Sequence, residues 1–241
     1  MDYSAMAAHY DDIMVLGKYY DYPAIAEHLA AVTDARQVLE VGVGTGLVVE
    51  HLLKFRSDYD GVTGIDITPV MLDIARERLQ YFPQVDLHEQ DVAQLDLGGR
   101  QYDIAFSYGG TWYFVPDGDS YAMVSHIRDD QGNACGLERV AAHLARGGRL
   151  LLGIQDPHSC YSRSLGNGTT YTQQLFPLGG GFRKEYVLTR DGADGAPMVY
   201  QVTDYRVYSF QEALDLLSRS GLRPVTAEQR HDPKFLEFAQ A

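Results

Sequence analysis

The sequence of 241 residues predicts an α/β fold, with one mostly parallel, seven-stranded sheet and helices on both of its faces. Two observations predict it. From Gln37 to Asp156, short apolar segments of strand length alternate with segments whose apolar residues have helical spacing. Turn-forming residues, among them the glycine-rich GVGTG, separate these segments. Strands that alternate with helices form parallel sheets through right-handed crossovers, so the carboxyl ends of the strands are expected to share one edge.

The elements of this sheet follow from apolar spacing and helix caps. The five central strands are expected at QVLEV, GVTGID, VDLHEQD, YDIAFS and RLLLGIQD. Helices are expected over residues 46–55, from Thr68-Pro69 to about residue 79, near 136–145 with a glycine stop at Arg146-Gly147-Gly148, and over 210–220. RPVTAEQR and FLEFAQA supply two last strands and complete the sheet of seven.

Two regions lie outside this alternation. Residues 3–15 and about 22–32 have helical apolar spacing and are expected to form two helices before the sheet. The rhythm then breaks over residues 159–181, which are polar, aromatic and rich in glycine. FRKEYVLTR and MVYQVTDYRVYSF alternate like strands on either side of the turn-forming DGADGAP. They predict an antiparallel hairpin inserted over the sheet.

Composition excludes several classes of protein. The formal net charge is −13 and no run of Lys or Arg forms a basic patch, so no nucleic-acid partner is expected. No apolar run approaches the ~18 residues that a membrane span needs, and no membrane partner is expected. Two cysteines, Cys135 and Cys160, have no disulfide or metal spacing, which indicates a cytoplasmic protein. The sequence leaves the oligomeric state open, a homodimer included.

The glycine-rich turn after the first strand indicates a nucleotide-type ligand. Gly42, Gly44 and Gly46 remove side chains along a stretch of backbone, against which a ligand can lie. The dinucleotide pattern G-x-G-x-x-G is not met, because the third glycine comes one position early and Leu47 follows it. The phosphate-loop pattern fails as well, since no Lys follows the glycines. The turn therefore favours a nucleoside without a polyphosphate.

The same stretch, VLEVGVGTG, resembles the signature loop of class I S-adenosylmethionine-dependent methyltransferases, which have a Rossmann-like fold. The resemblance continues through GVTGIDIT, HEQDVAQLDL, YDIAFSYGG and LARGGRLLLGI, and covers residues 37–156 together with the last helix and two strands. It implies S-adenosylmethionine as cofactor. It also implies four parts for the chain: an N-terminal helical lid (1–35), a cofactor-binding core (36–157), an inserted substrate cap (158–208) and a C-terminal completion of the sheet (209–241).

The resemblance implies a role for residues along the carboxyl edge of the sheet. Asp66 would accept hydrogen bonds from both ribose hydroxyls, since one carboxylate offers two acceptor oxygens to a vicinal diol. Asp91 would accept from the adenine amino group, the backbone amide of Val92 would meet a ring nitrogen, and Glu40 would support the amine end of the methionine tail. The remaining cofactor-binding candidates are the three glycines, Ile67, Ser107, and two tyrosines of the lid, Tyr10 and Tyr20.

Catalytic residues are not fixed by these motifs, because the sulfonium is a good leaving group and the protein mainly aligns donor and acceptor. His158, directly after the fifth strand, is the leading candidate for a general base, although a lone histidine at the start of a loop is commonly structural. Tyr108 and Tyr171 are the other candidates. SYGGTW (residues 107–112) replaces the Asn-Pro-Pro-Tyr type of motif, which counts against methylation of DNA, glutamine or protein release factors. No set of metal ligands has a paired spacing.

Function is then expected to be methyl transfer to a small-molecule acceptor, an amine or a hydroxyl. Glycine and amino-sugar N-methyltransferases, which the chain resembles, place a lid and an inserted hairpin over the site. One alternative is a cyclase that consumes the same cofactor without methyl transfer, by attack of its amine on its γ-carbon to give azetidine-2-carboxylic acid and methylthioadenosine. A non-catalytic nucleoside-binding module is the last alternative.

Overall fold

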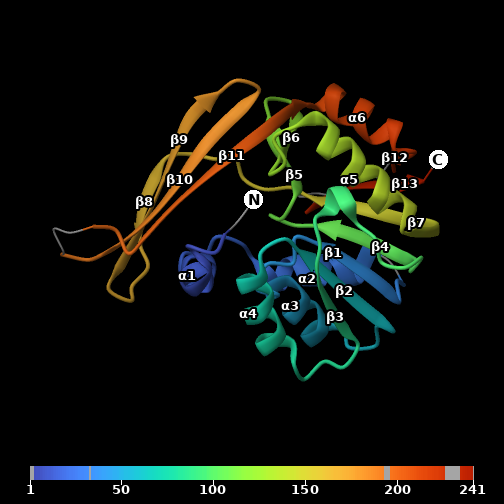
Figure 1. Ribbon diagram of the computed structural model, residues 1–241, viewed down its shortest axis with the longest axis horizontal. Coiled ribbons are helices and arrows are strands. Elements are labelled where there is room, and N and C mark those ends of the chain that lie inside the picture. The colour runs from blue at the N-terminus through green and yellow to red at the C-terminus, as the bar shows by residue number, and fades with distance from the viewer. Residues whose placement is uncertain (1–2, 33, 193–195, 226–233, 241) are drawn as a thin grey trace.

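The computed structural model describes residues 3–32, 34–192, 196–225 and 234–240, which form two sheets joined side by side (Figure 1). The main sheet has seven strands. In spatial order they are β12 (Leu222–Pro224), β13 (Phe235–Gln240), β7 (Leu144–Gly153), β4 (Tyr102–Ser107), β1 (Gln37–Val41), β2 (Gly61–Asp66) and β3 (Val85–Glu89). Strands β7, β4, β1, β2 and β3 are parallel neighbours, whereas β13 is antiparallel to both β7 and β12. The predicted mostly parallel, seven-stranded sheet is confirmed.

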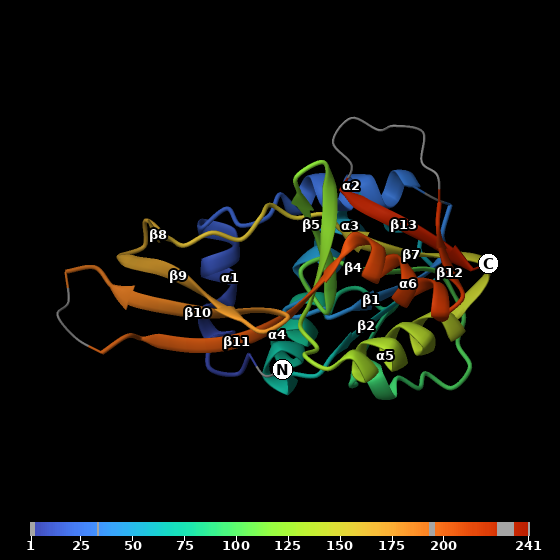
Figure 2. The ribbon, with the colours of Figure 1, turned by 90° about the horizontal axis from the view of Figure 1, so that it is seen from above.

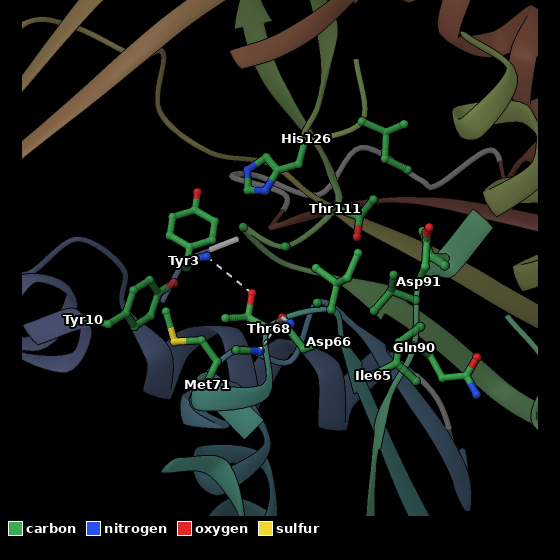
Figure 3. A pocket seen from close by; sticks show the side chains of 18 residues that line it. Tyr3, Tyr10, Ile65, Asp66, Thr68, Met71, Gln90, Asp91, Thr111 and His126 are labelled. Atoms are coloured by element: carbon green, nitrogen blue, oxygen red, sulfur yellow. Dashed lines mark hydrogen bonds between the residues drawn. The ribbon is translucent and has the colours of Figure 1, made fainter. Parts of the chain in front are cut away.

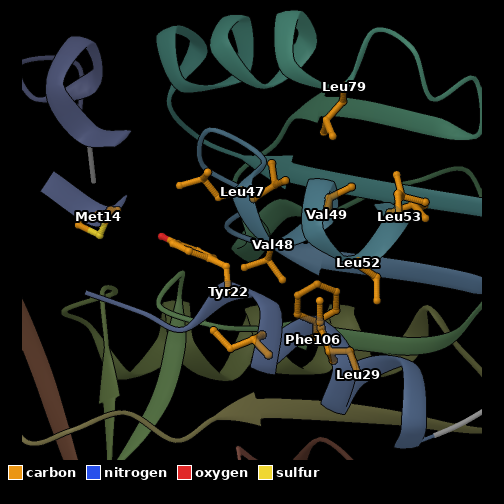
Figure 4. Packing of buried hydrophobic residues seen from close by; sticks show 14 of the residues in the cluster. Met14, Tyr22, Leu29, Leu47, Val48, Val49, Leu52, Leu53, Leu79 and Phe106 are labelled. Carbon is orange, nitrogen blue, oxygen red and sulfur yellow. The ribbon is translucent and has the colours of Figure 1, made fainter. Parts of the chain in front are cut away.

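Helices cover both faces of the main sheet because successive side chains of a strand point to opposite faces. Val38 of β1 packs in one buried cluster with residues of α2 (Tyr22–Val32), α3 (Leu47–Phe55) and α4 (Pro69–Leu79), shown in part in Figure 4. Leu39, the next residue, packs in a second cluster with residues of α5 (Asp130–Ala142) and α6 (Phe210–Arg219). The sheet therefore separates two apolar cores and leaves the strand ends free for a ligand.

The helix α5 and the strand β7 correct one expected boundary. The helix begins at Asp130, because the Asp129 side chain accepts a hydrogen bond from the backbone N–H of Gly132 at 2.6 Å. It ends at Ala142, and the predicted glycine stop lies inside β7 instead. Gly147 there has a φ of 81°, where the register between β4 and β7 shifts. Glycines that suit a helix end suit a strand irregularity equally well, because both need positive φ.

A six-stranded antiparallel sheet, the cap sheet, stands beside the main sheet (Figures 1 and 2). In spatial order its strands are β5 (Trp112–Asp117), β6 (Ser120–Ser125), β11 (Val199–Ser209), β10 (Gly181–Arg190), β9 (Thr169–Leu178) and β8 (Tyr161–Ser164). Strands β10 and β11 are the predicted hairpin, which is confirmed. The other four strands were not predicted. β8 and β9 were not predicted because polar residues stand at positions where an alternating strand normally has apolar ones. Gln173 of β9, for example, is a polar residue with a buried side chain.

The N-terminal segment lies between the two sheets (Figures 1 and 2). A continuous helix over residues 3–15 was expected, but α1 covers only Ala7–Asp11 and continues as a π-helical turn, η1 (Asp12–Leu16). The second predicted helix is α2. At the other end of the chain, most of the predicted strand RPVTAEQR falls on residues 226–233, outside the described residues. No helix in the described part of the chain is long and apolar enough to cross a membrane.

Candidate cofactor and acceptor site

The glycine turn between β1 and α3 uses its three glycines in three different ways. All three have positive φ: 78° at Gly42, 54° at Gly44 and 80° at Gly46. A Cβ on Gly42 would lie 2.7 Å from the Cα of Gly110, and one on Gly46 would lie 2.9 Å from the side chain of Leu79 in α4. A Cβ on Gly44 would meet no heavy atom within 4 Å. Gly42 and Gly46 thus allow close packing of the protein, while Gly44 leaves space for a ligand.

Asp66, at the carboxyl end of β2, holds this turn in place. Its Oδ2 accepts from the backbone N–H of Gly44 at 2.9 Å, and its Oδ1 accepts from the backbone N–H of Thr68 at 2.9 Å. Burial raises the pKa of Asp66, and these backbone hydrogen bonds oppose that rise. Each carboxylate oxygen accepts more than one hydrogen bond. The carboxylate can therefore fix the turn and still face a diol.

Asp91 and Val92 form the next part of the same edge, after β3. The Asp91 side chain caps a short 3₁₀ helix, η2 (Val92–Gln94), by accepting from the backbone N–H of Ala93 at 2.9 Å. Both Asp91 and Val92 face a cavity, which also receives the side chains of Asp66 and Ile67. The expected order of acidic residues along the edge is therefore present in space.

This cavity, the cofactor pocket, has an empty volume of about 780 Å³, including open solvent at its mouth. Tyr3, Tyr10 and His126 lie toward one side of it and Asp91 toward the other (Figure 3). Seven predicted cofactor-binding residues line it: Tyr10, Gly42, Gly44, Asp66, Ile67, Asp91 and Val92. The bare backbone of Gly44 forms part of its wall.

Four other predicted cofactor-binding residues do not line the cofactor pocket. Gly46 packs on α4, and Ser107 is fully buried, where its Oγ accepts from the backbone N–H of Trp112 at 3.4 Å. Tyr20 packs on Gly109, a residue of the pocket wall, and donates to Gln155 Oε1 at 3.0 Å. Their predicted roles stay predictions.

The fourth, Glu40, is a buried carboxyl group at the end of β1. It is only 2% exposed, and its Oε2 has no hydrogen-bond partner among the described residues. Burial, with a smaller contribution from the charge of Asp66, raises the pKa of Glu40 well above its usual range. A buried, unpaired carboxyl oxygen is costly unless a donor reaches it, directly or through water. This observation fits an amine end of the cofactor near Glu40.

A second cavity, the acceptor chamber, adjoins the cofactor pocket and shares Tyr3, Tyr10, Gly109 and His126 with it. Its empty volume is about 310 Å³. Tyrosines from the N-terminal segment and from the cap sheet supply seven of the fourteen residues that line it. The phenol groups of Tyr3, Tyr186 and Tyr205 contact one another: Tyr3 lies 3.3 Å from each of the other two, which also share a hydrogen bond.

Two histidines face the acceptor chamber as neutral rings. Sequence analysis singled out His158, whose Nε2 lies 2.6 Å from the hydroxyl of Tyr113. Burial, and secondarily the charge of Lys184, lowers the pKa of His158 to about 3. His126, after β6, was missed. Burial, then the charges of His158 and Lys184, lowers the pKa of His126 to about 3. Unlike His158, His126 lines both cavities.

Two predicted catalytic residues lie away from the junction of the two cavities. Tyr108 packs in a T-shaped contact with Tyr20, and its hydroxyl donates to the carbonyl of Ile154 at 3.3 Å. It lines an outer groove, which shares Tyr19, Tyr20, Gln155 and His158 with the wall of the chamber. Tyr171 is buried in the apolar core and lines neither cavity. Their catalytic roles stay predictions.

The N-terminal segment is tied to the glycine turn through Arg78 of α4. The Arg78 guanidinium donates to Asp11 in α1, to the carbonyl of Thr45 at 2.7 Å and to Glu50 at 2.9 Å. The Thr45 hydroxyl donates to Asp11 at 2.7 Å. Lid, turn and α4 thus form one hydrogen-bonded unit beside the cofactor pocket. In the described part of the chain, no group of three or more His, Cys, Asp or Glu could hold a metal ion.

The fold and the pocket define a class, which comparison with known proteins supports. Residues 38–130 match the methyltransferase domain family. The match covers the part of the chain that holds the glycine turn, Asp66 and Asp91, and it supports a methyltransferase domain there.

Particular relatives are more distant. The N,N-dimethyltransferase of dTDP-4-amino-2,3,4,6-tetradeoxy-D-glucose from Saccharopolyspora spinosa is 30% identical over 115 residues, which cover 48% of this chain and 39% of that protein. The magnesium-protoporphyrin O-methyltransferase of Rhodobacter capsulatus is 34% identical over 83 residues, which cover 34% of this chain and 35% of that protein. The chain therefore matches little more than a third of the length of these curated relatives.

Solved structures share the fold over nearly the whole chain. DesVI of Streptomyces venezuelae superimposes with a TM-score of 0.70 at 21% identity and covers 97% of both chains. CalS10, an amino pentose methyltransferase from Micromonospora echinaspora with S-adenosylmethionine bound, gives a TM-score of 0.66 at 23% identity and covers 93% of both chains. At these identities the likeness shows the fold.

Proposed function

We propose that this protein transfers the methyl group of S-adenosylmethionine to an amine of a small molecule held in the acceptor chamber. One observation carries the proposal: the chamber meets the cofactor pocket at Tyr3, Tyr10, Gly109 and His126, on the side away from Asp91. A cofactor with its adenine near Asp91 would direct its other end toward this junction. When bound, that cofactor supplies a methyl group on a sulfonium.

The lining of the acceptor chamber favours an amine in its neutral form. No Asp or Glu is among the residues that line it, so an ammonium would find no counter-ion there. A buried charge without a partner is unfavourable, and loss of a proton relieves the cost. The neutral amine is the nucleophilic form. The match to an amino-sugar N,N-dimethyltransferase supports an amine as the acceptor. Methyl transfer to a hydroxyl would give a product methylated on oxygen instead of nitrogen, so identifying the product distinguishes the two reactions.

The chain's own residues then position the acceptor, and the proton that the methylated amine loses passes to solvent, because His126 and His158, with pKa values of about 3, do not hold it near neutral pH. The neutral rings of His126 and His158 can each accept a hydrogen bond from the amine, and His126 stands nearest the cofactor side because it lines both cavities. The tyrosine hydroxyls orient polar groups of the acceptor, and their ring faces attract the developing positive charge. Alignment of the acceptor with the methyl group is the main contribution expected for this reaction.

In this proposal the four predicted parts of the chain keep their roles. Residues 1–35 close the site, 36–157 and 209–241 hold the cofactor, and 158–208 cap the acceptor together with β5 and β6. Both cysteines are free thiols, which fits a cytoplasmic enzyme of small-molecule metabolism.

The test is to identify the nucleoside that purified protein releases from S-adenosylmethionine. S-adenosylhomocysteine that forms only when an amino sugar, free or nucleotide-linked, is added would support methyl transfer, and mass spectrometry of the sugar would locate the methyl group on nitrogen or oxygen. Methylthioadenosine released without any acceptor would overturn the proposal in favour of the cyclase. Tight cofactor binding with no turnover across a panel of amines would point to a binding module instead.

A further inference from the structure

The acceptor chamber contains a buried lysine that the proposed methyl transfer does not use. Lys184 of β10 is 1% exposed and lines the chamber. Its Nζ donates to the hydroxyl of Tyr19 at 2.7 Å and lies 5.2 Å and 4.6 Å from the ring centroids of Tyr19 and Tyr186. Within the described ranges, none of the ion pairs includes Lys184. An ammonium has three N–H donors, so two are available to a ligand.

A second donor in the same chamber has no acceptor. Gln155, after β7, is 6% exposed, and its Oε1 accepts from the hydroxyl of Tyr20. Its Nε2 is buried without a hydrogen-bond partner among the described residues. The two donors are linked through neighbouring rings, because Tyr19 binds Lys184, Tyr20 binds Gln155, and the centroids of these rings are 4.8 Å apart.

Both spare groups are donors, so the missing partner is an acceptor of hydrogen bonds. Buried polar groups in proteins are almost always paired, and a buried cation needs a negative charge more than a neutral oxygen. We propose that the acceptor chamber has an oxyanion subsite, in which Lys184 and Gln155 bind a carboxylate or phosphate-type group of the acceptor. The acceptor is then an amine that also carries an oxyanion. This inference rests on the proposed function for the chamber's role, but the subsite itself can be tested without turnover.

Binding of an anion in the chamber can be detected through the protonation of Lys184, because the groups that face this lysine are neutral. Burial lowers the pKa of Lys184 to about 7. His126 and His158 face it as neutral rings, and burial raises the pKa of the surrounding phenols, Tyr19 and Tyr186 among them. An anion that contacts Lys184 stabilises the ammonium and raises its pKa. At pH 8 the free lysine is mostly neutral, so binding of an anion takes up close to one proton at this residue.

The experiment compares three ligands of similar shape on the protein saturated with S-adenosylhomocysteine: benzoate, phenylphosphonate and neutral benzamide. Titration calorimetry at pH 8 in buffers of different ionisation enthalpy gives both the affinity and the number of protons taken up. We expect at least one oxyanion to bind ten-fold or more tightly than benzamide, with uptake of close to one proton. The tighter of benzoate and phenylphosphonate identifies the oxyanion that the chamber prefers.

Two variants assign the effect to the subsite. Lys184→Met should abolish proton uptake and the preference for the anion, and Gln155→Leu should weaken the anion several-fold while the uptake persists. Both should bind S-adenosylhomocysteine like the parent, which shows that they are folded. Equal affinity for all three ligands in the parent protein, no oxyanion binding, or uptake that survives in Lys184→Met would overturn the inference. Failure of the proposed function would appear separately, as absent turnover of S-adenosylmethionine.

Discussion

The two cavities of this protein are built in opposite ways. The cofactor pocket lies at the carboxyl edge of the main sheet and is formed by short segments that each follow a strand, such as the glycine turn and Asp66. The acceptor chamber is formed by residues far apart in the sequence, from Tyr3 to Tyr205. The position of the N-terminal segment between the two sheets brings these residues together. Local rules of sequence describe the first cavity, and tertiary packing creates the second.

The largest loss of unfolding free energy is expected for a substitution within the glycine turn. Gly42→Ala should lower the free energy of unfolding by about 2 to 4 kcal/mol, because positive φ and a clash with the backbone of Gly110 act together. Gly44→Ala is the matched control, since its φ is also positive but its Cβ has space; about 1 kcal/mol is expected. Urea unfolding measures both. Equal losses in the two variants would contradict the separate roles given to these glycines.

A smaller effect is expected where the lid joins the cofactor half. Arg78→Ala removes hydrogen bonds to Asp11, Glu50 and the carbonyl of Thr45, and should cost about 1 to 2 kcal/mol in unfolding free energy. Arg76→Ala on the same helix is the control. Arg76 is half exposed and pairs only with the exposed Asp73, so about 0 to 0.5 kcal/mol is expected. A loss of the same size in both variants would show that Arg78 does not hold the lid.

A third effect concerns the pH dependence of stability and the acceptor chamber. The pKa of His126 and that of His158 are both lowered to about 3, so between pH 6.5 and 3 the unfolded chain binds more protons than the folded protein. The stability that these neutral rings contribute is complete above about pH 6.5 and is lost as pH falls toward 3, with a slope of at most about 1.4 kcal/mol per pH unit for each ring. His126→Gln should flatten the unfolding free energy over this window. An unchanged slope would mean that His126 is protonated in the folded protein.

Sequence analysis found the cofactor half because its determinants are local. Gly42, Gly44, Asp66 and Asp91 each follow a strand, and parallel strands bring their carboxyl ends together whatever lies between them. The prediction of site residues was weaker where a residue's role depends on contacts that its own sequence motif does not specify. Ser107 follows the rule in sequence, yet its hydroxyl is buried against the backbone of Trp112.

The acceptor half was found only in part. The hairpin β10–β11 has a clear alternation of side chains, but β5 and β6 were missed although Gly118 and Asp119 form the two-residue turn between them. His126 follows β6, so the missed hairpin also hid this histidine. Lys184 could not have been recognised from sequence, because an isolated lysine in an alternating strand is normally exposed. Its burial depends on tyrosines from the N-terminal segment.

The most direct test of the division between a cofactor half and an acceptor half is a comparison of two variants. Titration calorimetry measures the affinity of each for S-adenosylhomocysteine. Asp66→Ala removes the carboxylate from the cofactor half and should weaken binding by about 10- to 100-fold, since a charged group's hydrogen bonds contribute roughly 1.5–3 kcal/mol. Lys184→Met alters only the acceptor half and should leave the affinity within two-fold of the parent. An unchanged affinity in Asp66→Ala, or an equal loss in Lys184→Met, would contradict the account.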